Sequence, residues 1–161
     1  MNNYINYNEL RKLGAKAEKS RPMLGSLLIK EGKAYFTDGL YLVAMGGYQG
    51  APDMVINLNT YGKPAGEYPE LTGVMKGPFN QVAFESSIYG GRVINQFKRD
   101  DGLIVYIDED IKNQIKRLVV NKKFTLDISQ IKTNGSIGLY EINDDTKIYF
   151  GLKRREVEKN V

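Results

Sequence analysis

The sequence predicts an α+β fold of one domain, in which two helices pack on antiparallel sheets. The chain has 161 residues, of which 42% are hydrophobic and 11% aromatic, enough for one globular core. Short segments rich in β-branched and aromatic residues alternate with turn-forming residues, which is typical of antiparallel strands. Two segments, near residues 7–18 and 109–120, instead carry apolar residues at helical spacing.

The composition excludes several classes of activity. The chain contains no cysteine and no histidine, which removes disulfides, Ser-His-Asp and Cys-His nucleophilic systems and His-ligated zinc. An enzyme would need carboxylate, lysine or tyrosine chemistry, and no such constellation can be assembled from the sequence. We therefore predict no enzymatic activity and no cofactor. No apolar run approaches the ~18 residues of a membrane span, and residues 1–4 lack a signal-peptide pattern, so we expect a cytoplasmic protein without a membrane partner.

The first predicted helix follows Asn6 and runs to about Glu18. Asn6 as N-cap and Glu9 at the third helical position form the capping-box arrangement. An apolar stripe at spacings i, i+3 and i+7 consists of Leu10, Leu13 and Ala17. Pro22 cannot continue the helix, and we expect it to open the first strand.

A three-stranded meander is predicted between residues 22 and 44. Its strands are separated by a tight turn at Glu31-Gly32 and a second turn at Thr37-Asp38-Gly39.

Residues 46–102 are predicted to form a long irregular insert, because glycine and proline interrupt this segment repeatedly. Residues 54–57 alternate like a short strand, and residues 81–84 and 92–97 are predicted to pair as a hairpin around Tyr89-Gly90-Gly91. Loops of this length in a compact domain are usually functional or disordered.

The second half repeats the order of strand, helix and strands. A strand at residues 103–107 leads into Asp108, the predicted N-cap of a helix that runs to about Val120. Its buried face is predicted to contain Ile111, Ile115, Leu118 and Val119. Further strands are predicted at residues 124–132, 136–142 and 147–152, with turns at Asn134-Gly135 and residues 143–145. The domain thus spans residues 1–152, and the charged tail 153–161 is expected to be mobile or a short helix.

Two stretches resemble the bacterial DNA polymerase sliding clamp. Clamp domains typically read R-P-x-L-x-G-x-L, a short turn and A-T-D-G-x-R-L-A, which Arg21-Pro22 and Thr37-Asp38-Gly39 match in part. Residues 105–108 and 111–118 also look like the strand and basic helix of the clamp repeat. The resemblance implies a single DNA-clamp-like domain whose two helices line one side of paired sheets. The frequent Lys, Asn, Ile and Tyr residues suggest an AT-rich genome, such as that of a phage or mobile element.

The basic residues gather near the two helices, in a chain of net charge +4. In sliding clamps the corresponding helices face duplex DNA, so the resemblance implies non-specific phosphate contacts here. The candidate DNA-binding residues are Arg11, Lys12, Lys16, Lys19, Lys112, Lys116, Arg117, Lys122 and Lys123. The alternative is that these side chains form an ordinary solvated face of two amphipathic helices.

The resemblance also implies a site for peptides of DNA polymerase or other replication proteins. The matching positions are Arg21, Thr37 and Leu42. Tyr41 stands where the family has arginine and Leu40 where it has a polar residue, and the family's pocket needs side chains of a following domain that this chain lacks. The alternative is that Leu42 belongs to the core and Thr37 to the turn.

Two functions follow from these observations. The first is a clamp-like, sequence-independent DNA-binding protein of DNA replication. Sliding clamps are rings of six domains, so a chain with one domain either assembles as a homo-oligomeric ring or has the clamp fold without the clamp's function. The alternative is a clamp mimic or adaptor that binds host replication or defence proteins, such as a phage-encoded inhibitor. Turns and helix starts explain the acidic pairs in the chain, so no metal site is predicted.

Overall fold

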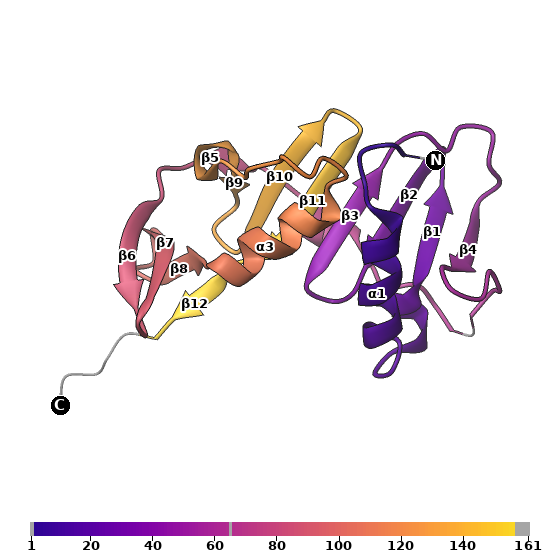
Figure 1. The fold of residues 1–161 in the computed structure, drawn as a ribbon, viewed down its shortest axis with the longest axis horizontal. Helices are drawn as coiled ribbons and strands as arrows, with labels where there is room; N and C mark the ends of the chain where they lie inside the picture. Colours follow the sequence, from indigo (N-terminus) through magenta and orange to yellow (C-terminus); the bar gives the residue numbers. More distant parts are fainter. Residues whose placement is uncertain (1, 65, 157–161) are drawn as a thin grey trace.

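The computed structural model describes residues 2–64 and 66–156, and it is an α+β architecture of three α-helices and two antiparallel sheets. The molecule is elongated, with strand β4 at one end and strand β6 at the other (Figure 1).

The larger sheet joins the two halves of the chain through its centre. Its strands, in spatial order, are β4 (Met54–Asn57), β1 (Ser26–Lys30), β2 (Lys33–Thr37), β3 (Tyr41–Met45), β11 (Thr146–Gly151), β10 (Ile137–Asn143), β9 (Lys132–Thr133) and β5 (Asn80–Gln81). The meander β1-β2-β3 of the first half therefore meets the meander β9-β10-β11 of the second half. Their third strands pair antiparallel, with Leu42 opposite Tyr149. The predicted meander of the first half is confirmed, including both turns.

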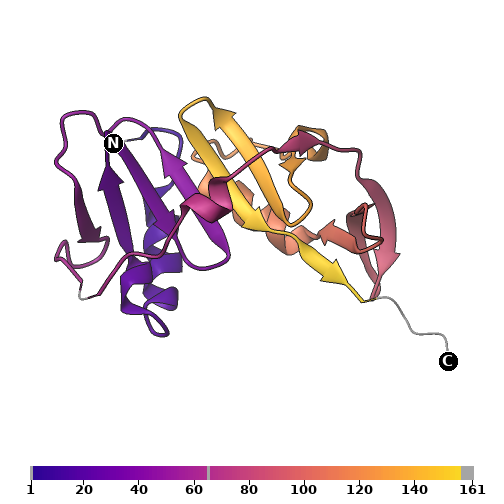
Figure 2. The same cartoon turned by 180° about the vertical axis from the view of Figure 1, so that it is seen from behind.

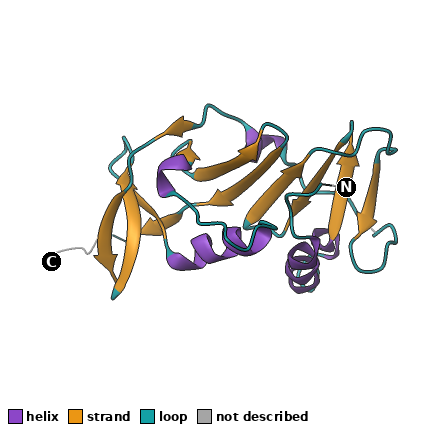
Figure 3. Cartoon of the chain, turned by 45° about the horizontal axis from the view of Figure 1, so that its top comes forward, coloured by secondary structure: helices purple, strands orange, loops and turns teal. Residues whose placement is uncertain are grey.

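Both long helices begin at the predicted caps. Helix α1 (Tyr7–Ala17) starts after Asn6, whose side chain accepts a hydrogen bond from the Glu9 N–H at 3.3 Å. Helix α3 (Glu109–Leu118) starts after Asp108, whose carboxylate accepts from the Ile111 N–H at 3.1 Å. The two helices lie on the same side of the larger sheet (Figure 3).

The main hydrophobic core fills the space between these helices and the sheet. The predicted buried face of α3 is confirmed by the burial of Ile111, Ile115, Leu118 and Val119. They pack in one cluster with Leu10 of α1 and with sheet residues that include Phe36, Val43, Ile148 and Phe150. Burial of this shared face is what holds the two helices on one side of the sheet.

The smaller sheet has the strand order β12 (Lys153–Arg155), β8 (Ile104–Ile107), β7 (Arg92–Lys98) and β6 (Glu85–Tyr89). The predicted hairpin exists, but its first strand covers residues 85–89 and not 81–84. Gly90 and Gly91 both have positive φ, so they form a two-residue turn that places Tyr89 opposite Arg92. The strand before that turn must therefore end at Tyr89.

Three further local predictions are wrong. A 3-10 helix, Pro22–Gly25, precedes β1, because proline favours the first position of a helical turn. Residues 124–132 form no long strand, and a 3-10 helix at Ile128–Gln130 begins there after Asp127, whose carboxylate accepts from the Ser129 N–H. Residues 153–155 were predicted to belong to a mobile or helical tail, but they form β12 against β8. Residues 157–161 lie outside the described part.

A segment of the predicted insert crosses the outer side of the larger sheet, opposite the helices (Figure 2). We call residues 66–79 the strap; they include the short helix α2 (Thr72–Met75). The Tyr68 O–H group lies 3.1 Å from the carbonyl oxygens of Ser26 and Tyr35. Leu71 is buried in a second apolar cluster with Leu42 and Tyr149. The strap therefore closes the outer side of the sheet.

Candidate nucleic-acid interface

Helices α1 and α3 lie next to each other and share a polar contact. Glu9 Oε1 accepts a hydrogen bond from Gln114 Nε2 at 3.1 Å and lies 3.4 Å from Arg117 Nε. Arg117 also donates to Gln114 Oε1 at 3.1 Å. This contact fixes the two helices side by side, and we call the exposed surface of α1, α3 and the segments that follow them, residues 18–20 and 119–123, the helix face.

The acidic side chains of the helix face itself, Glu9, Glu18, Glu109 and Asp110, all have partners. Besides Glu9, the Glu18 carboxylate accepts from Asn57 Nδ2 at 3.1 Å. Glu109 lies 2.7 Å from Lys112 Nζ in the next turn of α3. Asp110 pairs with Arg92 of β7 at 3.3 Å. These carboxylates are therefore engaged within the protein.

Most of the predicted DNA-binding lysines, in contrast, are exposed and unpaired. Within residues 2–64 and 66–156, no ion pair or hydrogen bond is made by the side chains of Lys12, Lys16, Lys19, Lys116, Lys122 and Lys123. Of the other three candidates, Arg11 donates to Asn8 at 2.8 Å, and Lys112 and Arg117 hold the pairs described above. The structure thus brings six free ammonium groups to the helix face.

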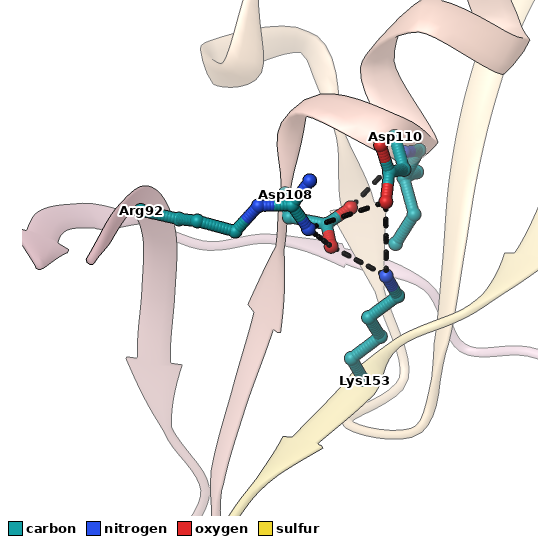
Figure 4. Close-up of polar contacts among 5 residues, drawn as sticks. Arg92, Asp108, Asp110 and Lys153 are labelled. Carbon is teal, nitrogen blue, oxygen red and sulfur yellow. Dashed lines mark hydrogen bonds and ion pairs between the residues drawn. The ribbon is translucent and has the colours of Figure 1, made fainter. Parts of the chain in front are cut away.

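A polar cluster anchors the first turn of α3 to the smaller sheet (Figure 4). The Asp108 side chain is 4% exposed, receives a hydrogen bond from Lys153 of β12 and lies 3.8 Å from Arg92 of β7. Burial alone would raise the pKa of Asp108. The hydrogen bonds from Lys153 and from the Ile111 N–H, together with the charges of Lys153 and Arg92, lower this pKa overall.

We expect this cluster to make the protein sensitive to acid. Because the folded-state pKa of Asp108 lies below the value in the unfolded chain, about 3.9, its contribution to stability is complete above that pH and is lost as the pH falls through the folded-state pKa. Urea unfolding between about pH 3 and pH 6 should show a smaller acid-induced loss in Asp108→Ala than in the wild type. The exposed Asp100→Ala variant should retain the wild-type profile, and an unchanged profile in Asp108→Ala would contradict this role.

The candidate peptide-binding residues do not form an open pocket. Leu42 is 3% exposed and lies in the cluster under the strap. Thr37, its cross-strand partner, accepts a hydrogen bond from the Gly39 N–H at 3.1 Å, and Arg21 is exposed before β1. Leu42 therefore belongs to the core and Thr37 to the turn, which is the alternative to a peptide-binding site. Sequence reasoning missed the strap, although Tyr68, Leu71, Val74 and Met75 follow a helix-like spacing.

The described residues hold no group of three or more acidic side chains arranged to bind a metal ion. Asp101 illustrates the local role of the acidic pairs, since it accepts from the Leu103 N–H at 3.0 Å and lies 2.7 Å from Arg99. Within the same part of the chain, every helix is too short or too polar to cross a bilayer.

No protein family, curated protein or solved structure shows a significant match to this chain.

Proposed function

We propose that this protein is a non-enzymatic, sliding-clamp-like DNA-binding protein of a replication system, which holds duplex DNA on its helix face by sequence-independent phosphate contacts. The observation that carries the proposal is the set of six unpaired lysines on a surface whose acidic side chains are already paired with other groups of the protein. Lysines on a helix face can bind phosphates without reading bases.

The arrangement of the two halves supports the same proposal. Each half consists of a helix followed by a three-stranded meander, the meanders join at β3 and β11, and both helices lie on one side of the joined sheet. The resemblance to sliding clamps implies two helices that line one side of paired sheets, with DNA on the helical side.

The first test of this proposal is whether the wild-type protein binds duplex DNA. Fluorescence anisotropy with duplexes of unrelated sequence should give equal affinities, and the logarithm of the association constant should fall linearly with the logarithm of salt concentration. If all six lysines contact phosphates, the slope is about −5. Binding that does not respond to salt, or no binding to duplex, would contradict the proposal.

A chain with one such domain needs several copies to encircle DNA, and its two ends provide surfaces for this. β4 and β6 are edge strands at opposite ends of the molecule (Figure 1). Met54 of β4 and Tyr61, which follows this strand, are exposed. In the cross-strand pair of the β6–β7 hairpin, Ile88 is 73% and Val93 58% exposed. Unpaired edges with apolar side chains favour association, and unlike ends allow a head-to-tail ring.

We expect light scattering on a size-exclusion column to give a closed oligomer for the wild type at low and moderate salt. Ile88→Lys combined with Val93→Lys should give a monomer, because charge at this edge opposes strand pairing. Leu40→Lys combined with Val120→Lys changes two exposed apolar residues away from both ends and should leave the native mass unchanged. A monomeric wild type would contradict ring formation.

The alternative proposal is a clamp mimic or adaptor that binds a host replication or defence protein. The exposed Ile88 and Val93 pair favours it, since an apolar hairpin of this kind can equally contact another protein. This alternative predicts a monomer or simple dimer that binds duplex DNA weakly and a protein partner tightly.

A further inference from the structure

A hollow opens on the helix face between three separate segments. It has a volume of about 630 Å³ and lies between the end of α1, the β2–β3 turn and the first turns of α3. This volume falls within the range of about 300–1,000 Å³ that is usual for sites of small ligands. We call it the interhelical hollow.

Its walls offer apolar and aromatic surface. Leu13 and Ala17 line it from α1, and Leu40, which is 72% exposed, lines it from the β2–β3 turn. Tyr41 adds a half-buried aromatic side chain that packs against the main core. Burial and the nearby Asp38 raise the pKa of Tyr41 to about 12, so its O–H group remains a hydrogen-bond donor at neutral pH.

The hollow also offers hydrogen-bonding groups of both kinds. The side chains of Lys16, Ser20 and Asn113 line it and make no hydrogen bond to any residue that the structure describes. Asp38 accepts the N–H groups of Leu40 and Tyr41 at 2.9 and 2.8 Å and has no cationic partner in the same part of the chain.

This combination selects among ligand classes. A simple anion would use only the donors and would be repelled by the Asp38 carboxylate. A planar heterocycle with donors and acceptors on its edge could use Asn113 and Ser20 as well as Asp38, while its faces contact Leu40 and Tyr41.

We propose that the interhelical hollow holds one unpaired nucleobase of the DNA bound on the helix face. This inference rests on the proposed function, because the free lysines Lys12 and Lys116 would hold the phosphate backbone on the two helices that border the hollow. Lys16 is the free lysine that also lines it. The protein should therefore prefer DNA with an unpaired nucleotide to a perfect duplex, since a base that is already unpaired costs least to extrude.

The test compares two duplexes of equal length and sequence, one of which carries a single-nucleotide bulge of 2-aminopurine. We expect the wild type to bind the bulged duplex about tenfold more tightly than the perfect one, with a change in 2-aminopurine emission. Asn113→Ala combined with Ser20→Ala removes hydrogen-bonding groups of the hollow but none of the helix-face lysines. It should abolish both the preference and the emission change, while the affinity for the perfect duplex should fall far less than the affinity for the bulged one. Gln49→Ala combined with Thr125→Ala, which changes exposed residues outside the hollow, should retain both.

The outcomes separate this inference from the function on which it rests. Equal affinity for the two duplexes would overturn the nucleobase site and leave phosphate binding intact. A preference that survives Asn113→Ala with Ser20→Ala would overturn its assignment to this hollow. Failure to bind either duplex would overturn the proposed function itself.

Discussion

Replacement of Lys12, Lys19 and Lys116 by glutamate is expected to weaken binding to duplex DNA by about 100-fold or more at ~0.1 M salt. These lysines are exposed, unpaired within the described residues and carried by the helix face. By counterion release, each phosphate contact contributes a factor of about eight at this salt concentration. The salt slope should fall by about 3 for the three contacts removed. Arg117 is a poorer choice for this test, because its replacement would also break the contact with Glu9.

The matched control replaces Lys30, Lys33 and Lys76 by glutamate. All three are exposed; Lys30 and Lys33 flank the β1–β2 turn, and Lys76 follows α2 in the strap, opposite the helices. The net charge changes by the same amount in both variants. Because the control lysines lie outside the helix face, the control variant should lose far less affinity for duplex DNA than the helix-face variant. Equal losses in both variants would show that net charge alone governs binding. No loss in either would favour the adaptor alternative.

Phe150→Ala is expected to lower the free energy of unfolding by about 3–5 kcal/mol. Phe150 is 1% exposed and lies in the main core, on the strand at the centre of the larger sheet. Its cross-strand partner is Gly138, and a Cβ atom on Gly138 would lie 2.4 Å from the phenyl ring. The ring therefore occupies the space that any other residue at Gly138 would need. Denaturant unfolding followed by circular dichroism measures the loss.

A double-mutant cycle tests this contact directly. Gly138→Ala alone should cost about 1–3 kcal/mol, because the added methyl group overlaps the ring of Phe150. In the double variant with Phe150→Ala that overlap is gone, so the combined loss should be clearly smaller than the sum of the two single losses. Additive losses would contradict the close approach of these residues.

Local chemistry explains which parts of the fold could be predicted. The caps Asn6 and Asp108 and the turn at Gly90-Gly91 depend on residues a few positions apart, so their sequence patterns were sufficient. Residues 124–132 also alternate apolar and polar side chains, but a strand needs a partner, and only Lys132–Thr133 pairs there. Phe124 and its alternating neighbours are half-buried against the core without strand pairing.

For the candidate site, the sequence alone could predict only which residue types take part. The sequence identifies the basic residues, but it does not show that Arg117 is engaged by Glu9 while Lys116 beside it is free. That distinction depends on the packing of α1 against α3. The interhelical hollow has no sequence pattern, because it is assembled from three segments distant in the chain. The strap over Leu42 likewise becomes visible only when the sheet is formed.

The pairing of β3 with β11 has a consequence for how the protein is made. β11 is synthesised only after every strand from β4 to β10, long after β3 has left the ribosome. Until then β3 is an open edge, with backbone groups available to any other strand. Contacts so distant in sequence also form slowly. We therefore expect the nascent first half to be the stage most prone to misassociation, which ends when β11 closes the centre of the sheet.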